Sequence, residues 1–213
     1  MIDIAVAAII DWIIGDPYWF PHPVIYMGKL ISFLEKKARK ICKSNKQLKV
    51  SGLFIVIVMC LVSFLIPYMV LLFTKNISWI YHIINIVFIW TTLAAKSLNR
   101  EGMRVYRSLE ENNIQDARKK LSYIVGRDTK DLSENEIIRA DVETIAENTS
   151  DGVIAPLLYA MIGGAPLALL YKAVNTMDSM LGYMNEKYRY IGFFPAKLRF
   201  RFETEFSYAR GSC

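Results

Sequence analysis

The sequence predicts an all-α fold: a multi-pass integral membrane helical protein with cytoplasmic helical loops. Of its 213 residues, 54% are hydrophobic, and the mean hydropathy is +0.26, which is more apolar than an ordinary soluble domain. Two stretches are long enough to cross a bilayer, which takes about 20 mostly apolar residues. Basic residues gather at one end of both stretches and therefore predict their orientation.

The two strong spans form a predicted transmembrane hairpin, residues 50–98. Residues 50–73 carry no charge, and residues 77–98 carry only Lys96. Both stretches exceed the length that a helix needs to cross the hydrocarbon core. We therefore expect two membrane-spanning helices joined by a short turn.

Two weaker apolar segments bracket this hairpin. Residues 2–14 contain Asp3 and Asp11 and are short for a full crossing, so a partly inserted or tilted helix would suit them. Residues 153–171 are uncharged, but a Gly-Gly pair at 163–164 and two prolines interrupt them. Either segment could span the membrane or enter it only in part.

The distribution of basic residues orients the hairpin. Between residues 29 and 49 there are eight Lys or Arg and one acid, three arginines follow residue 98 closely, and the turn at 74–76 has one lysine. Because cytoplasmic loops carry the excess of basic residues, both flanking loops should be cytoplasmic. The net charge of +6 and the pI near 9.1 then reflect topology and attraction to anionic lipid headgroups. No nucleic-acid partner is needed to explain them.

The first polar cluster is the loop GDPYWFPHPV at residues 15–24. Its glycine and prolines would end one helix, and the aromatic residues 18–20 suit an interfacial belt. That structural interpretation leaves His22 unexplained, because it is held between two prolines and close to Asp16. A histidine with so little backbone freedom suits a binding or acid–base role. Both interpretations stay open on spacing alone.

The second cluster covers residues 127–152. Ser133 and Glu136 form a capping box, which predicts a helix start. On that helix Ile138, Val142 and Ile145 fall on one side, with Glu136, Glu143 and Glu147 nearly opposite. A solvated face stabilised by an Arg139–Glu143 pair would show the same pattern.

The helix then ends in polar residues that lead directly into the apolar segment at 153. Carboxylates and amides at a cytoplasmic membrane surface could hold a divalent metal through oxygen ligands. Magnesium would suit them better than zinc, because the sequence has no cluster of Cys and His.

The third cluster is YKAVNTMDSMLGY at residues 171–183. On a helix its polar residues share one arc and its apolar residues the other, and Asp178 falls beside the apolar arc. A carboxylate held against apolar neighbours near a bilayer is costly unless it is paired. Asp178 therefore needs a partner, and we expect a functional role for it. Lys172 as a purely structural mate is the alternative.

Together these motifs resemble the CobD/CbiB family, the membrane-bound adenosylcobinamide-phosphate synthases of cobalamin biosynthesis. The similarity runs from about residue 2 to residue 197 and includes GDP, PHPV, RDT, VETIAENTSDGVIAPLLY, GGAPLALLYKAVNTMDSM and NExY. The resemblance implies an ATP-dependent amide ligase: ATP activates a propionate side chain of adenosylcobyric acid, and the amine of aminopropanol or its phosphate attacks. It also implies a multi-pass protein of the cell membrane with a cytoplasmic active face, and other membrane enzymes of the cobalamin pathway as partners.

This chemistry gives the polar residues their expected roles. The catalytic candidates are Asp128, Glu143, Glu147, Asp151, Asp178 and His22. The substrate-binding candidates are Asp16, Arg127, Asn148, Lys172, Asn175 and Ser179. We expect Glu143, Glu147 and Asp151 to bind Mg²⁺. The expectation of ATP depends on the resemblance, because the sequence has no Walker-type loop.

One predicted membrane domain covers residues 1–198: the hairpin, a cytoplasmic helical region at 99–152 and the broken apolar segment at 153–171. Residues 199–213 form an atypical tail, where the family would continue with an Asp-rich stretch and a further membrane segment. We therefore expect a shortened product. Two other functions stay open: a transporter of corrinoids or other small molecules, which would also use broken helices, and a non-catalytic membrane sensor or scaffold of the same fold.

Overall fold

The computed structural model describes residues 1–17, 19–183 and 185–211, with side chains described as far as residue 202. Residue 18 of the expected aromatic belt, the side chains of most of the predicted tail, and residues 212–213 lie outside this description. The described residues form helices and no strands, which confirms the all-α prediction. The helices are α1 (Ile2–Ile13), α2 (Pro23–Ile41), α3 (Asn45–Thr74), α4 (Ser78–Trp90), α5 (Ala95–Glu110), α6 (Ile114–Leu121), α7 (Glu134–Thr149), the π-helical turn η1 (Ser150–Ile154), α8 (Ala155–Leu181) and α9 (Phe193–Gly211).

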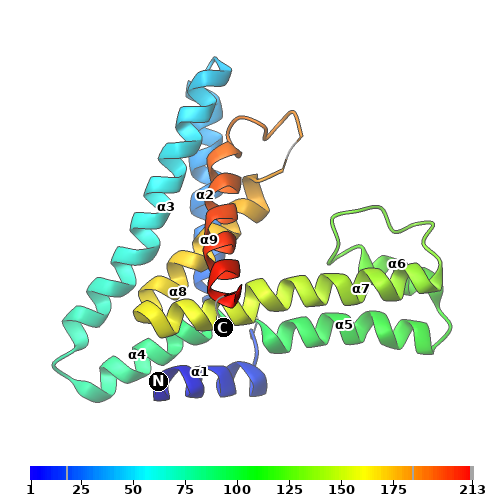
Figure 1. The fold of residues 1–213 in the computed structure, drawn as a ribbon, viewed down its shortest axis with the longest axis horizontal. Helices are drawn as coiled ribbons and strands as arrows, with labels where there is room; N and C mark the ends of the chain where they lie inside the picture. Colours follow the sequence, from blue (N-terminus) through cyan, green and yellow to red (C-terminus); the bar gives the residue numbers. More distant parts are fainter. Residues whose placement is uncertain (18, 184, 212–213) are drawn as a thin grey trace.

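Two groups of helices meet near the start of α8 (Figure 1). One group contains α2, α3, α9 and the second half of α8, which pack along one another. In the other direction α5, α6 and α7 form an arm, while α1 lies along α4. The arm therefore joins the rest of the molecule at the junction of α7 with α8 and at that of α4 with α5.

Three helical stretches are long and apolar enough to cross a membrane. They are Asn45–Thr74, Ser78–Glu110 and Glu134–Leu181. The first is α3 alone and includes the predicted span 50–73. The second joins α4 to α5, and the third joins α7, η1 and α8. This composition agrees with the predicted multi-pass membrane architecture.

The second predicted span differs from the single helix expected over residues 77–98. Helix α4 has 13 residues, about 20 Å at 1.5 Å per residue, which is less than the ~30 Å hydrocarbon core. It ends at Trp90, and the next two residues, Thr91 and Thr92, donate their hydroxyls to the carbonyls of Phe88 and Ile89, at 2.8 and 2.6 Å. Such bonds compete with the backbone pairing that would continue the helix.

Helix α8 is interrupted where the sequence predicted a break. Gly163 has φ −139° and ψ 20°, and Gly164 has φ 68° and ψ −164°. The second pair of angles is open mainly to glycine, which has no Cβ. Pro166 follows within the first turn of the new helical segment, where its missing N–H costs little. The second half of α8 therefore runs in a new direction (Figure 1).

Three apolar clusters hold the helices together. Ile31, Met59 and Met177 are fully buried between α2, α3 and α8. Ala7 and Ile89 centre the cluster of α1, α4 and the start of α8. The third cluster, in the arm, is smaller and contains Val105, Ala117, Leu121, Ile137 and Ala140.

Helix α7 buries a different face from the one expected. The residues predicted to share its apolar side were Ile138, Val142 and Ile145, but Ile138 is 45% and Val142 62% exposed. Ile137 and Ala140 are buried instead. Helices α5 and α6 pack against the side of α7 that carries Ile137 and Ala140, and this packing determines which face of α7 is buried.

Candidate functional site

The rigid Pro-His-Pro loop fixes the orientation of one imidazole. His22 caps α2, and its Nδ1 accepts the backbone N–H of Val24 at 3.3 Å. A neutral ring with this bond carries its proton on Nε2, which lies 3.4 Å from Asp16 Oδ1. The other Asp16 oxygen accepts the Ser97 hydroxyl at 2.7 Å. Burial raises the pKa of the Asp16 carboxyl, but the contacts with His22 and Ser97 outweigh burial and hold that pKa below its ordinary value.

Lys172 of α8 lies among three carboxylates. Its ammonium interacts electrostatically with Asp16, Asp11 and Asp151. Asp11 is 1% exposed; one of its oxygens accepts the Ala95 N–H at 2.7 Å, and the other has no hydrogen bond within the described structure. The loop at 15–24, α1 and η1 thus all place acids around this one lysine.

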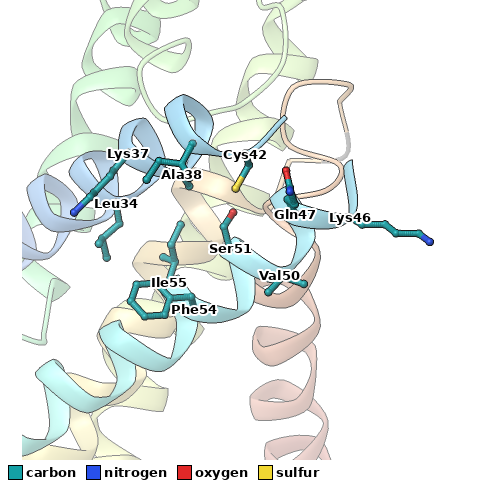
Figure 2. A pocket seen from close by; sticks show the side chains of 11 residues that line it. Leu34, Lys37, Ala38, Cys42, Lys46, Gln47, Val50, Ser51, Phe54 and Ile55 are labelled. Carbon is teal, nitrogen blue, oxygen red and sulfur yellow. The ribbon is translucent and has the colours of Figure 1, made fainter. Parts of the chain in front are cut away.

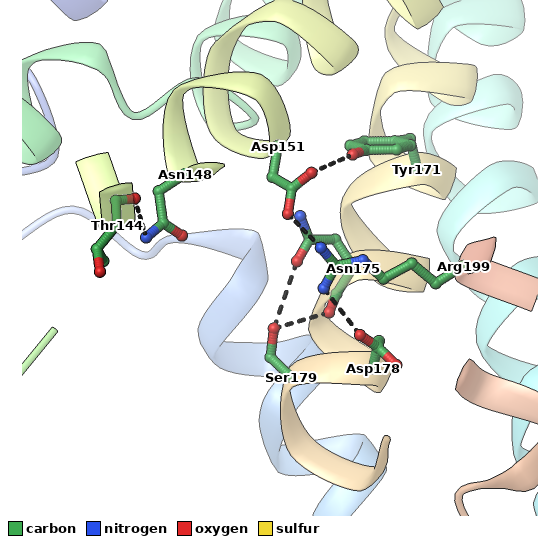
Figure 3. A network of polar contacts seen from close by, with 8 residues as sticks. All are labelled: Thr144, Asn148, Asp151, Tyr171, Asn175, Asp178, Ser179 and Arg199. Atoms are coloured by element: carbon green, nitrogen blue, oxygen red, sulfur yellow. Dashed lines mark hydrogen bonds and ion pairs between the residues drawn. The ribbon is translucent and has the colours of Figure 1, made fainter. Parts of the chain in front are cut away.

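Asp178 has a cation as its partner, but the cation is Arg199 of α9 and not Lys172. Arg199 donates from Nη1 to Asp178 at 2.8 Å and from Nη2 to Asp151 at 2.6 Å. The Asp151 carboxylate also accepts the Tyr171 hydroxyl at 3.3 Å (Figure 3). One guanidinium therefore connects η1, the second half of α8 and the first part of α9.

A polar cavity of about 520 Å³ opens beside this network. Its wall comes from residues 124–127, α7, η1, α8 and the start of α9. Eight of the residues that line it are site candidates from separate sequence motifs: Arg127, Glu143, Glu147, Asn148, Asp151, Asn175, Asp178 and Ser179. A concave site with convergent polar groups is where ligands usually bind.

Two amides in the cavity wall are fixed by bonds within their own helices (Figure 3). Asn148 donates from Nδ2 to the Thr144 carbonyl at 2.9 Å. The Ser179 hydroxyl contacts the Asn175 backbone carbonyl at 2.9 Å and its side-chain oxygen at 3.3 Å. The Asn148 side-chain oxygen and the Asn175 Nδ2 take no part in these bonds. These two amides therefore offer the cavity one acceptor and one donor.

Some candidates lie at the edge of this cavity or away from it. Asp128 does not line the cavity; its side chain is 71% exposed, and it accepts the Lys130 N–H at 3.1 Å. Glu143 lies at the rim, where it pairs with Arg139 at 2.7 Å and with Arg127 at 3.8 Å. The Arg139–Glu143 pair is the ion pair that we expected if this side of α7 were a solvated face. His22, Asp16 and Lys172 belong to the adjoining charge cluster, which reaches the cavity through Asp151.

The three expected Mg²⁺ ligands all line the cavity, but they do not form a ready-made metal site in the described chain. No group of three His, Cys, Asp or Glu side chains in the described chain is placed to hold a metal ion. Glu143 and Asp151 already pair with arginines, whereas Glu147 has no ion-pair partner among the described residues. Asp151 lies in η1, where the wider π-helical turn changes the angular spacing, and its carboxylate meets Arg199. The residues therefore do not fit a preformed three-carboxylate metal site.

Three residues of the site were missed by reasoning from the sequence. Tyr171 orients Asp151, Asp11 faces Lys172, and Arg199 was assigned to the tail. The requirement that Asp178 find a partner did point to a cation. Only packing could show that this cation comes from residue 199 and not from the nearby lysine.

Comparison with known proteins gives consistent matches. Residues 4–199 match the family described as CobD/Cbib protein. Cobalamin biosynthesis protein CobD of Clostridium acetobutylicum is 68% identical over 198 residues, which are 93% of this chain and 63% of that protein. Cobalamin biosynthesis protein CbiB of Salmonella typhi is 46% identical over 194 residues, 91% of this chain and 61% of that protein.

The chain therefore spans less than two thirds of the length of these relatives, and no solved structure matches it. The matched residues include all three polar motifs and reach Arg199, which joins Asp151 to Asp178. On the extent of the match and the identity to its relatives, this chain belongs to the CobD/CbiB family.

Proposed function

We propose that this chain acts in cobalamin biosynthesis as the core of an ATP-dependent amide ligase. The ligase would join the amine of aminopropanol, or of its phosphate, to a propionate side chain of adenosylcobyric acid. The names of the relatives support the pathway. The observation that carries the reaction class is the polar cavity in which carboxylates, arginines and two fixed amides from separate motifs come together.

The proposed reaction has two steps. In the first, a propionate oxygen attacks the γ-phosphorus of ATP, so that an O–P bond forms and ADP leaves. In the second, the amine attacks the acyl carbon, a C–N bond forms, phosphate leaves, and the nitrogen gives up a proton. Both steps move negative charge between oxygens, and fixed cations at the site stabilise such charge.

Arg127 and Arg199 are the cavity arginines that can meet this charge. A guanidinium presents several donors in one plane and binds carboxylate or phosphate through two of them. Arg199 is already oriented by Asp151 and Asp178, so a ligand would find it ordered. Arg127 lies at the rim, with 56% of its side chain exposed, and suits the first contact with an incoming anion.

Glu147 is our candidate for the group that accepts the proton of the attacking amine. It lines the cavity, and no cation neutralises it in the part of the chain that the structure describes. General bases of this kind must lie within hydrogen-bond reach of the reacting atom. Asn148 and Asn175, whose amides are fixed, would bind peripheral amides of the corrinoid. Mg²⁺ stays a prediction, because it is expected to bind together with ATP.

The test is complementation of a bacterial strain that grows on cobinamide but not on cobyric acid. The strain receives this chain, the chain extended with the C-terminal part of the Clostridium acetobutylicum relative, and Glu147→Gln in whichever of the two supports growth. The control is Glu134→Gln, on the same helix but outside the cavity. We expect growth with one of the two versions, no growth with Glu147→Gln, and normal growth with the control. Failure of both unsubstituted versions would contradict the ligase.

One observation, the break in α8, supports the alternative function as a transporter. Gly163 and Gly164 line a cavity of about 560 Å³ together with His82 and Asn85, and transporters place interrupted helices at their substrate sites. Uptake of a labelled corrinoid into vesicles, without ATP-dependent amide formation, would support transport. A non-catalytic scaffold predicts instead that Glu147→Ala and Asp178→Ala leave biological activity unchanged.

A further inference from the structure

A second cavity lies apart from the polar site, between the end of α2 and the start of α3 (Figure 2). Its volume is about 680 Å³. Most of its wall is apolar, and several of the apolar side chains are widely exposed: Ile41 and Val50 are each 66% exposed and Phe54 58%. We call this cavity the α2–α3 groove, lined on its apolar side by Leu34, Ala38, Ile41, Val50, Phe54 and Ile55.

The Gln47 side-chain oxygen and the Ser51 hydroxyl, two of the uncharged polar groups in the α2–α3 groove, are already used within the protein. Gln47 accepts the backbone N–H of Lys43 at 2.8 Å and of Ser44 at 3.2 Å as part of the capping box that starts α3. The Ser51 hydroxyl donates to the Leu48 carbonyl at 2.8 Å. A polar ligand would find little to bind there, whereas a hydrocarbon chain fits the wall.

Two lysines line the same groove from opposite walls. Lys37 comes from α2 and Lys46 from α3, and they extend to opposite sides in Figure 2. Neither has an ion-pair partner within the described chain. The single acid of this basic stretch, Glu35, is already paired with Arg39 at 2.8 Å. The groove therefore carries uncompensated positive charge beside its apolar wall.

The place of the groove along α3 points to the membrane surface. Helix α3 starts at Asn45, and the uncharged span begins at residue 50. Lys46 thus lies where lipid headgroups would be, and Phe54 and Ile55 lie more than two helical turns further along α3, inside the span. Long basic side chains at such a boundary reach toward headgroups while their stems cover apolar surface, and basic pockets between helices on the cytoplasmic side bind anionic lipids.

We propose that the α2–α3 groove binds an anionic phospholipid. An acyl chain lies on Leu34, Phe54 and Ile55, and the phosphate-bearing headgroup is held by Lys37 or Lys46. A phospholipid joins both features in one molecule and is present wherever a membrane-spanning chain is found. This inference is independent of the ligase, because no residue of the groove lines the polar cavity.

Cys42 provides a direct probe, because its side chain lies in the groove (Figure 2). The chain would carry Cys60→Ser and Cys213→Ser, so that Cys42 is the only thiol. It is reconstituted in phosphatidylcholine vesicles with or without phosphatidylglycerol, and the labelling rate with a neutral maleimide is measured. We expect phosphatidylglycerol to slow labelling several-fold, because the bound lipid covers the thiol.

A matched pair of variants separates a specific site from general surface charge. The variant Lys37→Gln with Lys46→Gln removes the two groove lysines, and Lys36→Gln with Lys43→Gln removes the same charge from neighbours that do not line the groove. We expect only the first pair to abolish protection. Equal protection in both pairs, or equal labelling with and without phosphatidylglycerol, would overturn the proposal. Protection in phosphatidylcholine that grows with protein density would assign the groove to a second copy and overturn it too.

Discussion

Loss of Arg199 should do the most damage to the polar site. Its guanidinium lies 2.6 Å from Asp151 and 2.8 Å from Asp178, and the three side chains are only 20%, 14% and 19% exposed. Arg199→Met keeps most of the packing but leaves two largely buried carboxylates without their shared cation. Removing one partner of a buried pair costs about 3–5 kcal/mol, and the remaining solvent access favours the lower end, about 3 kcal/mol.

The assay is thermal unfolding in detergent, followed by circular dichroism. For a chain of this size, about 3 kcal/mol corresponds to a fall in Tm of about 6–12 °C. The control is Arg139→Met, which removes an equally short ion pair to Glu143, at 2.7 Å, whose side chains are 80% and 51% exposed. Solvent screens an exposed pair, which therefore contributes little to stability, so the control should lower Tm by at most a few degrees.

A double variant tests the cause of the loss. If the charge that Asp178 keeps after the loss of Arg199 is responsible, Asp178→Asn in the Arg199→Met background should restore part of the stability. Equal falls in Tm for Arg199→Met and Arg139→Met would refute the claim that this pair of bonds holds α9 against α8. A further loss in the double variant would show that packing, and not charge, is what Arg199 provides.

Other expected outcomes concern backbone, titration and capping. Gly164→Ala should cost about 1–3 kcal/mol by urea unfolding, because its φ of 68° and ψ of −164° lie in a region open almost only to glycine; Gly126→Ala, in open space, should cost less. The lowered pKa of Asp16 contributes stability that is complete above its ordinary pKa of 3.8 and lost as pH falls through the lower folded value. Asp16→Asn should therefore remove this loss of stability at acidic pH, which unfolding measured at several pH values would show. Ser133→Ala should cost about 1 kcal/mol and speed amide hydrogen exchange in the first turn of α7.

Features that depend on a few neighbouring residues could be predicted from the sequence. The uncharged run at 50–73 lies within α3, as expected of an apolar run long enough to cross a bilayer. The Ser133–Glu136 capping box starts α7, and the Gly-Gly pair breaks α8. Each of these rests on local backbone chemistry that tertiary packing leaves in place.

Features that depend on a facing helix could not be predicted in the same way. The exposed positions of Ile138 and Val142 result from how α5 and α6 cover α7. The end of α4 at Trp90 was not predicted either, because the apolar run indicated a helix that continues to residue 98. A helical pattern gives the spacing of a face, but the neighbours decide which face is buried.

The candidate site shows the same division. By itself the sequence determined that the chain is helical and built for a membrane, and that three polar motifs are unusual enough to carry function. The tertiary structure decided that His22, Asp16 and Lys172 form one charge cluster, and that Arg199 joins Asp151 to Asp178. The physical reason is that a buried charge requires a partner, and which residue supplies it depends on distances in space between segments far apart in the chain.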